Sequence, residues 1–203
     1  MIGVVSYGMG NIQSVCNALV YLGHEVLVAQ SPDDLEQASR IILPGVGAFP
    51  AAMKRLQESG FADALHAHVR ERDKPLLGIC LGMQLLAETG TEFEACDGLG
   101  WIPGRVEIIP RGPKKLRLPQ VGWNELAVRD GARLFDGIEG DTSCYFVHSY
   151  QLNAAEPEDV VATVDYGGPV TAAVERENIF GAQFHPEKSA RVGLALLDMF
   201  ARL

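Results

Sequence analysis

The sequence predicts an α/β protein with an open, mostly parallel sheet, helices on both faces and additional antiparallel strands in the C-terminal half. Short β-rich runs alternate with helical patterns through the N-terminal half, which is typical of parallel strands joined by crossover helices. From Leu99 onward Gly and Pro become frequent, and the β-like runs there are expected to pair antiparallel or to extend the first sheet. No internal repeat or linker divides the 203 residues, so we expect a single domain over residues 1–203.

Strand and helix alternate four times in the N-terminal half. In the first helical run the apolar residues Ile12, Val15 and Leu19 recur at spacings of three and four, so one face of this helix is expected to pack on the sheet. Gly23 is expected to end it. The predicted strands are Ile2–Val5, Glu25–Ala29, Arg40–Leu43 and Leu76–Ile79. The predicted helices are Asn11–Leu22, Pro32–Ala38, Ala51–Arg72 and Gly82–Glu88.

The C-terminal half is predicted to hold short strands, one long loop and a closing helix. Arg111–Val121 is rich in Pro and basic residues and is expected to be a surface loop, and loops of this length are often functional. Apolar residues between Val192 and Phe200 predict a helix that covers the sheet. The predicted strands are Arg105–Ile109, Glu125–Val128, Cys144–Val147, Val160–Val164, Val170–Val174 and Ile179–Phe184.

Composition and charge exclude several classes of protein. Hydrophobic residues make up 47% and charged residues 21% of the chain, which is ordinary globular usage. The 17 Lys and Arg against 26 Asp and Glu give a net charge of −9, which repels phosphate backbones and anionic lipid. We therefore expect neither a nucleic-acid partner nor a membrane role. The apolar start Ile2–Val5 lacks a basic leader and is too short to span a bilayer, so we expect a cytoplasmic protein.

The four cysteines do not form a metal-binding pattern. Cys16, Cys80, Cys96 and Cys144 are scattered, without a CxxC pair or a close Cys/His cluster. We therefore expect no metal and no cofactor. A cysteine in such a chain is by default a small buried hydrophobe, so a reactive role requires evidence from its context.

Cys80 has that context. It lies between Gly78 and Gly82, directly after an apolar strand and before a helical run, which is the pattern of a strand–turn–helix nucleophile elbow. Side chains at the flanking positions would clash in so sharp a turn, and the following helix N-terminus favours thiolate over thiol. The alternative is that the two glycines only allow tight packing of helix on strand.

His185 and Glu187 are the candidate base and its orienting group. Pro186 favours an extended conformation at His185, so residues 185 and 187 are expected to project from the same face. A carboxylate on one ring nitrogen would leave the other free to take the thiol proton. The alternative is that Glu187 is an ordinary acidic residue in the first turn of the following helix, and that His185 is only a polar residue at the end of a strand. His148, after an apolar run, is the one rival base.

Backbone donors for an oxyanion are expected in two places. Gly45, Val46 and Gly47 follow the strand Arg40–Leu43, at the carboxyl edge where ligands of open α/β sheets bind. The N–H of Leu81, next to the nucleophile, is the natural second donor. The alternative reading of the glycine pair is a simple turn.

Three of these segments together resemble the class I (triad) glutamine amidotransferases in order and in spacing. They are Pro44–Gly47, Gly78–Gln84 and His185–Glu187. Further segments, spread over almost the whole chain, are similar to one branch of that family, the glutaminase subunits of imidazole glycerol phosphate synthase. These segments are Ser6–Asn11, Val121–Asn124, Phe146–Tyr150 and His185–Ser189. The triad is shared by the entire family, whereas the Tyr-Gly-Met-Gly-Asn and Gly-Trp-Asn runs are particular to the branch.

The resemblance implies a glutaminase that works through a covalent intermediate. Cys80 would attack the side-chain amide of glutamine, His185 would shuttle the proton and Glu187 would orient His185. Ammonia would leave, and water would hydrolyse the glutamyl thioester to glutamate. Gln84 and Glu92 would contact the bound glutamine. Its α-carboxylate would lie near two further residues, Ser149 and Tyr150.

The resemblance also implies a partner, a cyclase of (β/α)₈ fold that forms a heterodimer with this chain and receives the ammonia through a sealed route. Ligand binding to the cyclase would trigger a peptide rearrangement in Gly45–Gly47 that forms the oxyanion hole. Ser6 and Gln120 stand where many members carry Asp and His, so no interface hydrogen bond is carried over to them. The partner face would include Asn11, Trp123, Tyr145 and Lys188.

Three other functions remain open at this point. A glutaminase of another synthase would share the triad but lack the Tyr-Gly-Met-Gly-Asn start, and a cysteine peptidase or acyl hydrolase would use the same elbow. A regulatory module with an idle site is disfavoured, because every triad member is present. Gly8–Asn11 could be taken for a phosphate loop, but it lacks the third glycine of the dinucleotide motif and the lysine of a P-loop.

Overall fold

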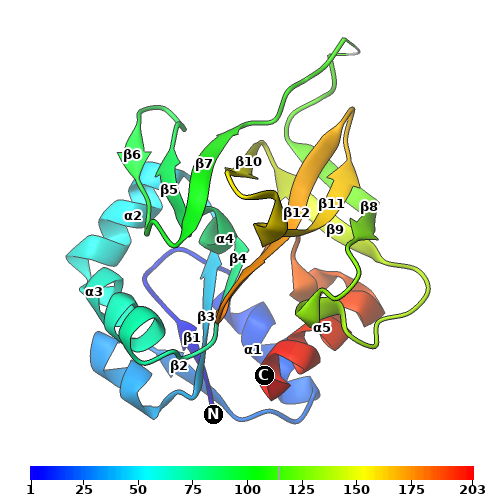
Figure 1. Ribbon diagram of the computed structural model, residues 1–203. Helices are drawn as coiled ribbons and strands as arrows, with labels where there is room; N and C mark the ends of the chain where they lie inside the picture. The colour runs from blue at the N-terminus through cyan, green and yellow to red at the C-terminus, as the bar shows by residue number, and fades with distance from the viewer. Residues whose placement is uncertain (114) are drawn as a thin grey trace.

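The computed structural model describes residues 1–113 and 115–203, which form two sheets packed with helices (Figure 1). The larger sheet has nine strands in the order β2-β1-β3-β4-β13-β12-β11-β8-β9, and the smaller has the order β10-β7-β5-β6. The strands are β1 (Ile2–Val5), β2 (Val26–Ala29), β3 (Arg40–Gly45), β4 (Leu76–Cys80), β5 (Ala87–Gly90), β6 (Cys96–Asp97), β7 (Ile102–Ile108), β8 (Gln120–Val128), β9 (Ser143–His148), β10 (Tyr150–Ala154), β11 (Val160–Asp165), β12 (Pro169–Arg176) and β13 (Ile179–Ala182).

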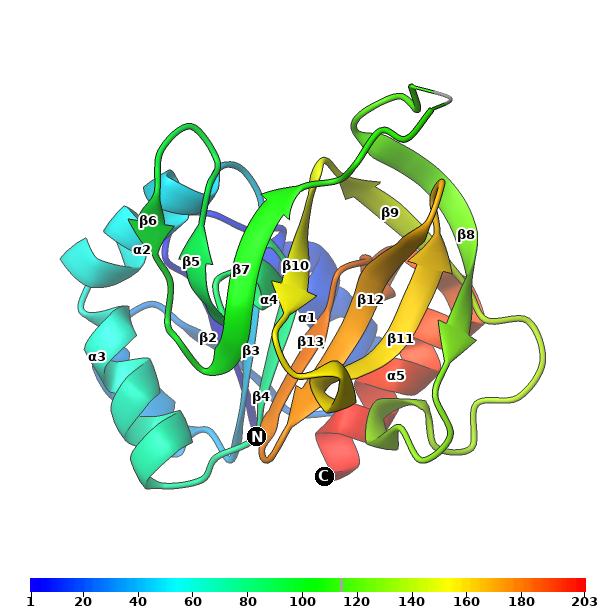
Figure 2. The ribbon, with the colours of Figure 1, turned by 45° about the horizontal axis from the view of Figure 1, so that its top comes forward.

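Helices cover both faces of the larger sheet. The α-helices are α1 (Ile12–Tyr21), α2 (Phe49–Glu58), α3 (Phe61–Leu65), α4 (Leu81–Gln84) and α5 (Ala190–Arg202). The 3-10 helices are η1 (Pro32–Gln37), η3 (Arg133–Phe135), η4 (Pro157–Asp159) and η5 (Pro186–Lys188), and η2 (His66–Glu71) is a π-helix. Helices α1 and α5 share one apolar core with the strands, whereas α2 and α3 pack in a second core on the other face (Figure 2). The predicted α/β fold with helices on both faces is confirmed.

The sheet changes from parallel to antiparallel pairing between β13 and β12, one strand away from the strand that ends at Cys80. Strands β2, β1, β3, β4 and β13 are parallel to one another, and β12, β11, β8 and β9 continue the sheet with antiparallel pairing. The smaller sheet uses β7, which covers most of the predicted strand Arg105–Ile109 and pairs antiparallel with β10, together with strands that the sequence did not predict. The antiparallel strands predicted for the C-terminal half are therefore divided between the two sheets.

The predicted helix Ala51–Arg72 is interrupted. Helix α2 ends at Glu58 and α3 begins at Phe61. Gly60, between them, has a φ of 75°. A right-handed helix cannot continue through a left-handed residue, and glycine takes that conformation at little cost.

The predicted helix Gly82–Glu88 is wrong beyond Gln84, because the chain makes one helical turn and then enters β5. Leu85, Leu86 and Ala87 are all fully buried. A short run that is apolar on every side has no polar face, so its periodicity does not distinguish helix from strand.

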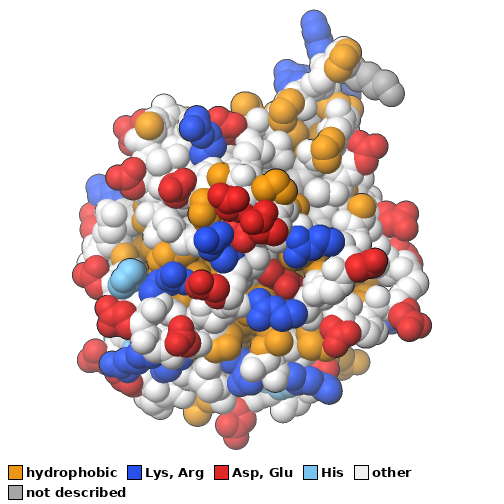
Figure 3. Space-filling model, in the orientation of Figure 1, with side chains coloured by type: hydrophobic (Ala, Val, Ile, Leu, Met, Phe, Trp, Pro, Cys, Tyr) orange, Lys and Arg blue, Asp and Glu red, His pale blue; other side chains and the backbone are white. Residues whose placement is uncertain are grey.

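Several strand boundaries differ in the C-terminal half. Strand β8 begins at Gln120, so the last two residues of the predicted loop Arg111–Val121 belong to a strand, and β13 ends at Ala182 rather than Phe184. Most of the segment between β7 and β8 projects from the body, with Lys and Arg side chains near its tip, although Lys114 lies outside the described residues (Figure 3). Among the described helices, none is both long and apolar enough to cross a membrane.

Candidate active site

Cys80 stands on a strained turn between β4 and α4. Its φ of 54° and ψ of −112° lie in a region that residues with side chains rarely adopt. A Cβ on Gly78 would come within 2.6 Å of the Gly82 carbonyl oxygen, and a Cβ on Gly82 would overlap the carbonyl oxygen of Leu43. Glycine is therefore required on both sides of the cysteine, as the elbow pattern predicts.

The order of the strands brings His185 to Cys80 across more than a hundred residues of sequence. Strand β13 lies beside β4 and parallel to it, with Ala182 paired to Ile79. The segments that follow these two strands therefore leave the sheet at the same edge. Strand β3 lies on the other side of β4 and pairs Gly45 with Cys80. All three segments singled out from the sequence therefore meet at one edge, where ligands of open α/β sheets bind.

His185 and Glu187 form a buried ion pair. The Nδ1 atom of His185 lies 2.9 Å from Oε1 of Glu187, and the two side chains are 4% and 1% exposed. Burial disfavours the charged imidazole, but hydrogen bonding to Cys80 and to Glu187 outweighs this and raises the pKa of His185 to about 9. Glu187 lies in the turn η5 rather than in an extended segment, so the two side chains meet across a turn.

Ser189 fixes the backbone of this pair. Its hydroxyl donates to the carbonyl of His185 at 2.7 Å and accepts from the N–H of Tyr145 at 3.0 Å. The N–H of His185 also donates to the carbonyl of Tyr145. The histidine is thereby attached to β9, through a serine that we did not single out from the sequence.

The remaining cysteines and histidines are poor alternatives. Burial raises the pKa of Cys16, of Cys96 and, to about 12, of Cys144. Burial also lowers the pKa of the rival base His148 to about 4, and its Nδ1 donates to the carbonyl of Tyr150 at 2.8 Å. His148 is thus a weak proton acceptor with one nitrogen already bound.

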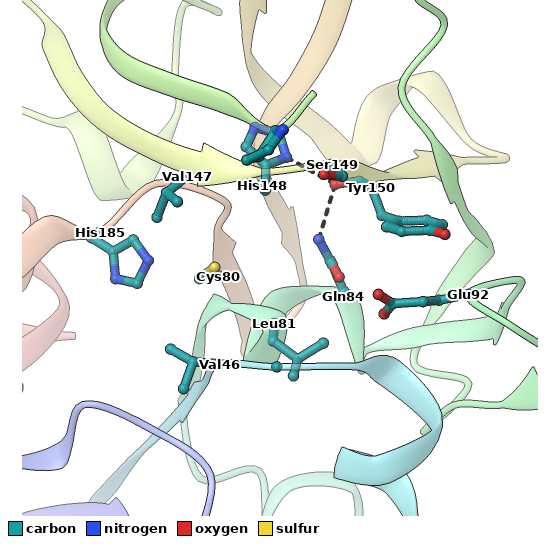
Figure 4. Close-up of a pocket in the computed structure, with 12 residues that line it drawn as sticks. Val46, Cys80, Leu81, Gln84, Glu92, Val147, His148, Ser149, Tyr150 and His185 are labelled. Carbon is teal, nitrogen blue, oxygen red and sulfur yellow. Dashed lines mark hydrogen bonds between the residues drawn. The ribbon is translucent and has the colours of Figure 1, made fainter. Parts of the chain in front are cut away.

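Cys80 and His185 open into one cavity of about 390 Å³ (Figure 4). Its wall includes every residue that the resemblance assigns to glutamine binding. These are Gln84, Glu92, Ser149 and Tyr150. The Glu92 carboxylate accepts the N–H of Phe49 at 2.8 Å, at the start of α2, which holds it at the cavity.

The expected oxyanion segment borders the same cavity. Val46, Gly47 and Leu81 line it, with Val46 and Leu81 on the side of Cys80 opposite to Val147 (Figure 4). Gly45 lies behind them, where a Cβ would come within 2.8 Å of the Tyr7 hydroxyl. The peptide groups of this segment are therefore close to the nucleophile.

The sequence model of the family described as glutamine amidotransferase class-I matches residues 4–202. The chain belongs to the class I glutamine amidotransferase family. Its full-length relatives bear names from one branch of it. Subunit HisH 2 of the imidazole glycerol phosphate synthase of Vibrio vulnificus is 48% identical over 198 residues, which cover 97% of this chain and 92% of the relative. Subunit HisH of Desulfitobacterium hafniense is 48% identical and covers 100% and 94%.

These identities confirm the resemblance of this amidotransferase to the imidazole glycerol phosphate synthase subunits. Solved structures at lower identity share the fold. A glutamine amidotransferase crystal structure has a TM-score of 0.76 at 23% identity, covering 100% of this chain and 99% of that one. The structure of PurLQS from Thermotoga maritima has a TM-score of 0.74 at 21% identity, covering 99% and 97%.

Three of the four residues expected at a partner face lie together on the amidotransferase surface. Trp123 is 53% exposed, and its ring meets that of Tyr145 edge-on with centroids 6.0 Å apart. The Nζ atom of Lys188 lies 6.0 Å from the Tyr145 ring centroid. Asn11 lines a small hollow with Val46 and with Glu187, the residue before Lys188.

Further exposed apolar residues extend this surface to the rim of the cavity. Val121 is paired with Val147 across β8 and β9, next to the pair of Trp123 and Tyr145. Val121 is 59% and Val147 is 37% exposed, and Val147 also lines the cavity. Val121 and Val147 lie in segments that carry the family resemblance, but we did not assign them to the partner face, although alternation of apolar residues along β8 is a signal that could have done so.

Proposed function

We propose that this chain is the glutaminase subunit of an imidazole glycerol phosphate synthase. It would hydrolyse glutamine to glutamate through a thioester on Cys80 and deliver ammonia to a cyclase in histidine biosynthesis. The observation that carries the proposal is the meeting of Cys80 and His185 at one cavity, with Glu187 bonded to Nδ1 of His185. The names and identities of the full-length relatives support the choice of synthase.

The proposed reaction assigns one task to each group. The Cys80 sulfur attacks the side-chain carbonyl carbon of glutamine, and peptide N–H groups of Gly45–Gly47 and of Leu81 stabilise the oxyanion that forms. His185, held by Glu187, gives its proton to the leaving nitrogen, so ammonia departs and a thioester remains. Water, activated by the neutral His185, then attacks the thioester carbonyl, which releases glutamate and returns the proton to sulfur.

The substrate would lie along the cavity wall. Gln84 and Glu92 are proposed to contact glutamine, with Ser149 and Tyr150 beside its α-carboxylate. Support comes from the convergence of these four side chains on the cavity that holds Cys80. A cavity of about 390 Å³ is large enough to hold a single amino acid such as glutamine.

The proposed partner is a (β/α)₈ cyclase that forms a heterodimer with this chain. The apolar pairs Val121–Val147 and Trp123–Tyr145 support this, because an exposed hydrophobic patch of this kind marks an interaction surface. The patch reaches the cavity rim, so a partner seated on it would cover the site and keep ammonia from water. We also propose a cytoplasmic location, since an unpaired reactive thiol suits a reducing compartment.

The substitution Cys80→Ala tests the proposal in the complex with the cyclase. We expect glutamine-dependent synthesis to fall to background and ammonia-dependent synthesis to remain, because only the ammonia source is lost. The assay compares both rates and measures glutamate released from free glutamine and from glutamine-containing peptides. Equal loss of both syntheses, or glutamate released from peptides, would contradict the proposed function.

A further inference from the structure

A chain of buried hydrogen bonds runs from β10 to the sulfur of Cys80. The Nε2 atom of Gln84 donates to the backbone carbonyl of Tyr150 at 3.0 Å and to Oε1 of Gln183 at 3.0 Å (Figure 4 shows the first of these). The Nε2 atom of Gln183 in turn lies 3.9 Å from the Cys80 sulfur. Gln183 is fully buried and Gln84 is 5% exposed.

The orientation of both amides follows from one backbone group. A peptide carbonyl only accepts hydrogen bonds, so the end of Gln84 that faces Tyr150 must be its NH₂ group. That NH₂ group also faces Gln183, which must therefore present its carbonyl oxygen there. The NH₂ group of Gln183 is left to face Cys80. This assignment rests on the contacts alone, because the opposite orientation would set two donors or two acceptors against each other.

Gln183 occupies the same side of the chain as the triad histidine. It precedes His185 by two residues, with the fully buried Phe184 between them. The N–H of Gln183 donates to the carbonyl of Ala172, which attaches the residue to β12 as the chain leaves β13. The Cys80 sulfur therefore has an imidazole and an amide donor from one short segment.

We infer that Gln183 is a positioning residue that donates an N–H to the Cys80 thiolate and holds the sulfur in its reactive orientation. This rests on the proposed function of Cys80 as a nucleophile. Hydrogen bonds to an ionised acceptor are shorter and stronger than those to a neutral one, so the contact favours thiolate over thiol. In a buried site such a donor has no water to replace it.

The test measures thiolate reactivity without glutamine or partner. The full-length chain is treated with iodoacetamide over a pH series, and alkylation of the Cys80 peptide is followed by mass spectrometry, with the Cys96 peptide as internal control. Gln183→Met keeps the volume and removes the donor. We expect Cys80 to react about tenfold more slowly at neutral pH, with the pH midpoint of alkylation displaced upward by about one unit.

A second variant separates this role from folding. Gln183→Glu keeps an acceptor for the Gln84 amide but sets an oxygen against the sulfur, so we expect an even slower reaction. If neither variant folds, Gln84→Met, which removes the group that orients Gln183, must slow Cys80 in the same way. Unchanged alkylation of Cys80 in any folded variant of this set would overturn the inference.

Gln151→Met is the matched control. The Gln151 side chain is also buried and accepts the N–H of Thr171 at 3.2 Å, but it does not line the cavity. We expect it to lower the melting temperature and to leave alkylation of Cys80 unchanged. A similar slowing in this variant would assign the effect to general loosening and overturn the role of Gln183. Because no glutamine is turned over, failure of this inference is distinct from failure of the glutaminase assignment.

Discussion

The charge on a single imidazole controls the proposed proton transfers. Glu187 lies against Nδ1 of His185 and helps to raise its pKa from 6.5 to about 9, against the opposing effect of burial. A histidine that keeps its proton at neutral pH is prepared to protonate the leaving nitrogen. The protonation of His185 thus depends on its hydrogen bonds to both Cys80 and Glu187.

The substitution Glu187→Gln should lower the pKa of His185 toward its ordinary value of 6.5, because the anion that favours imidazolium is replaced by a neutral amide. NMR titration of the His185 ring in the free chain measures the change. A pKa that stays near 9 in the variant would show that Glu187 does not tune the base.

The same pair makes stability depend on pH. A pKa that is raised on folding contributes stability that is complete below about 6.5 and is lost as pH rises through about 9. We therefore expect the wild-type free energy of unfolding to decline across this interval, and Glu187→Gln to weaken the decline. Chemical denaturation at a series of pH values measures it, and parallel curves for the two proteins would contradict the expectation.

At the scale of elements, Ser189 joins the turn that carries the triad to strand β9. Ser189→Ala would leave the partly buried N–H of Tyr145 without its side-chain acceptor, so we expect a loss of about 1–3 kcal/mol in the free energy of unfolding. Denaturant unfolding measures the loss. The exposed Ser59 at the end of α2 provides the control, and Ser59→Ala should change stability by about 0.5 kcal/mol or less. Equal effects of the two substitutions would refute this role of Ser189.

The sequence predicted correctly those elements that a short stretch of residues specifies by itself. The apolar strand before Cys80 and its flanking glycines specify an elbow by themselves, and the periodic helix near the N-terminus is found within a residue at each end. Strand β5 was missed because Leu85–Ala87 is apolar throughout and fully buried, so its periodicity favours neither helix nor strand. Its pairing with β6 and β7, which follow it in the chain, makes it a strand.

In the candidate site, too, residues with a local sequence pattern were predicted and residues without one were missed. The cavity gathers Cys80 and His185, which have their own sequence patterns. Gln183 and Ser189 have no such pattern, since a buried glutamine or serine is recognised only by the groups that it meets in space. The spacing of two between Gln183 and His185 was the one available signal.

For the whole molecule, the edge strand pair β8–β9 is the proposed partner face. Trp123→Ala should weaken binding to the cyclase by about 2 kcal/mol, or about 30-fold, because exposed tryptophans at interface centres carry much of the binding energy. Titration calorimetry with the purified cyclase measures the affinity, and melting of the free chain should be little changed.

Tyr21→Ala is the matched control for this surface. Tyr21 is 80% exposed at the end of α1, outside β8 and β9. Its removal should leave the affinity unchanged. Equal weakening by both variants would mean that the β8–β9 patch is not the specific docking surface.

The most direct measurement asks where the glutamyl group is carried during turnover. The complex is mixed with glutamine labelled in its carbon skeleton, quenched in acid within the first turnover, and digested for mass analysis. We expect label on the Cys80 peptide, removable by hydroxylamine as expected of a thioester, and none in the Cys80→Ala complex. Label attached to another residue, or labelled glutamate formed at the wild-type rate by the Cys80→Ala complex, would contradict this expectation.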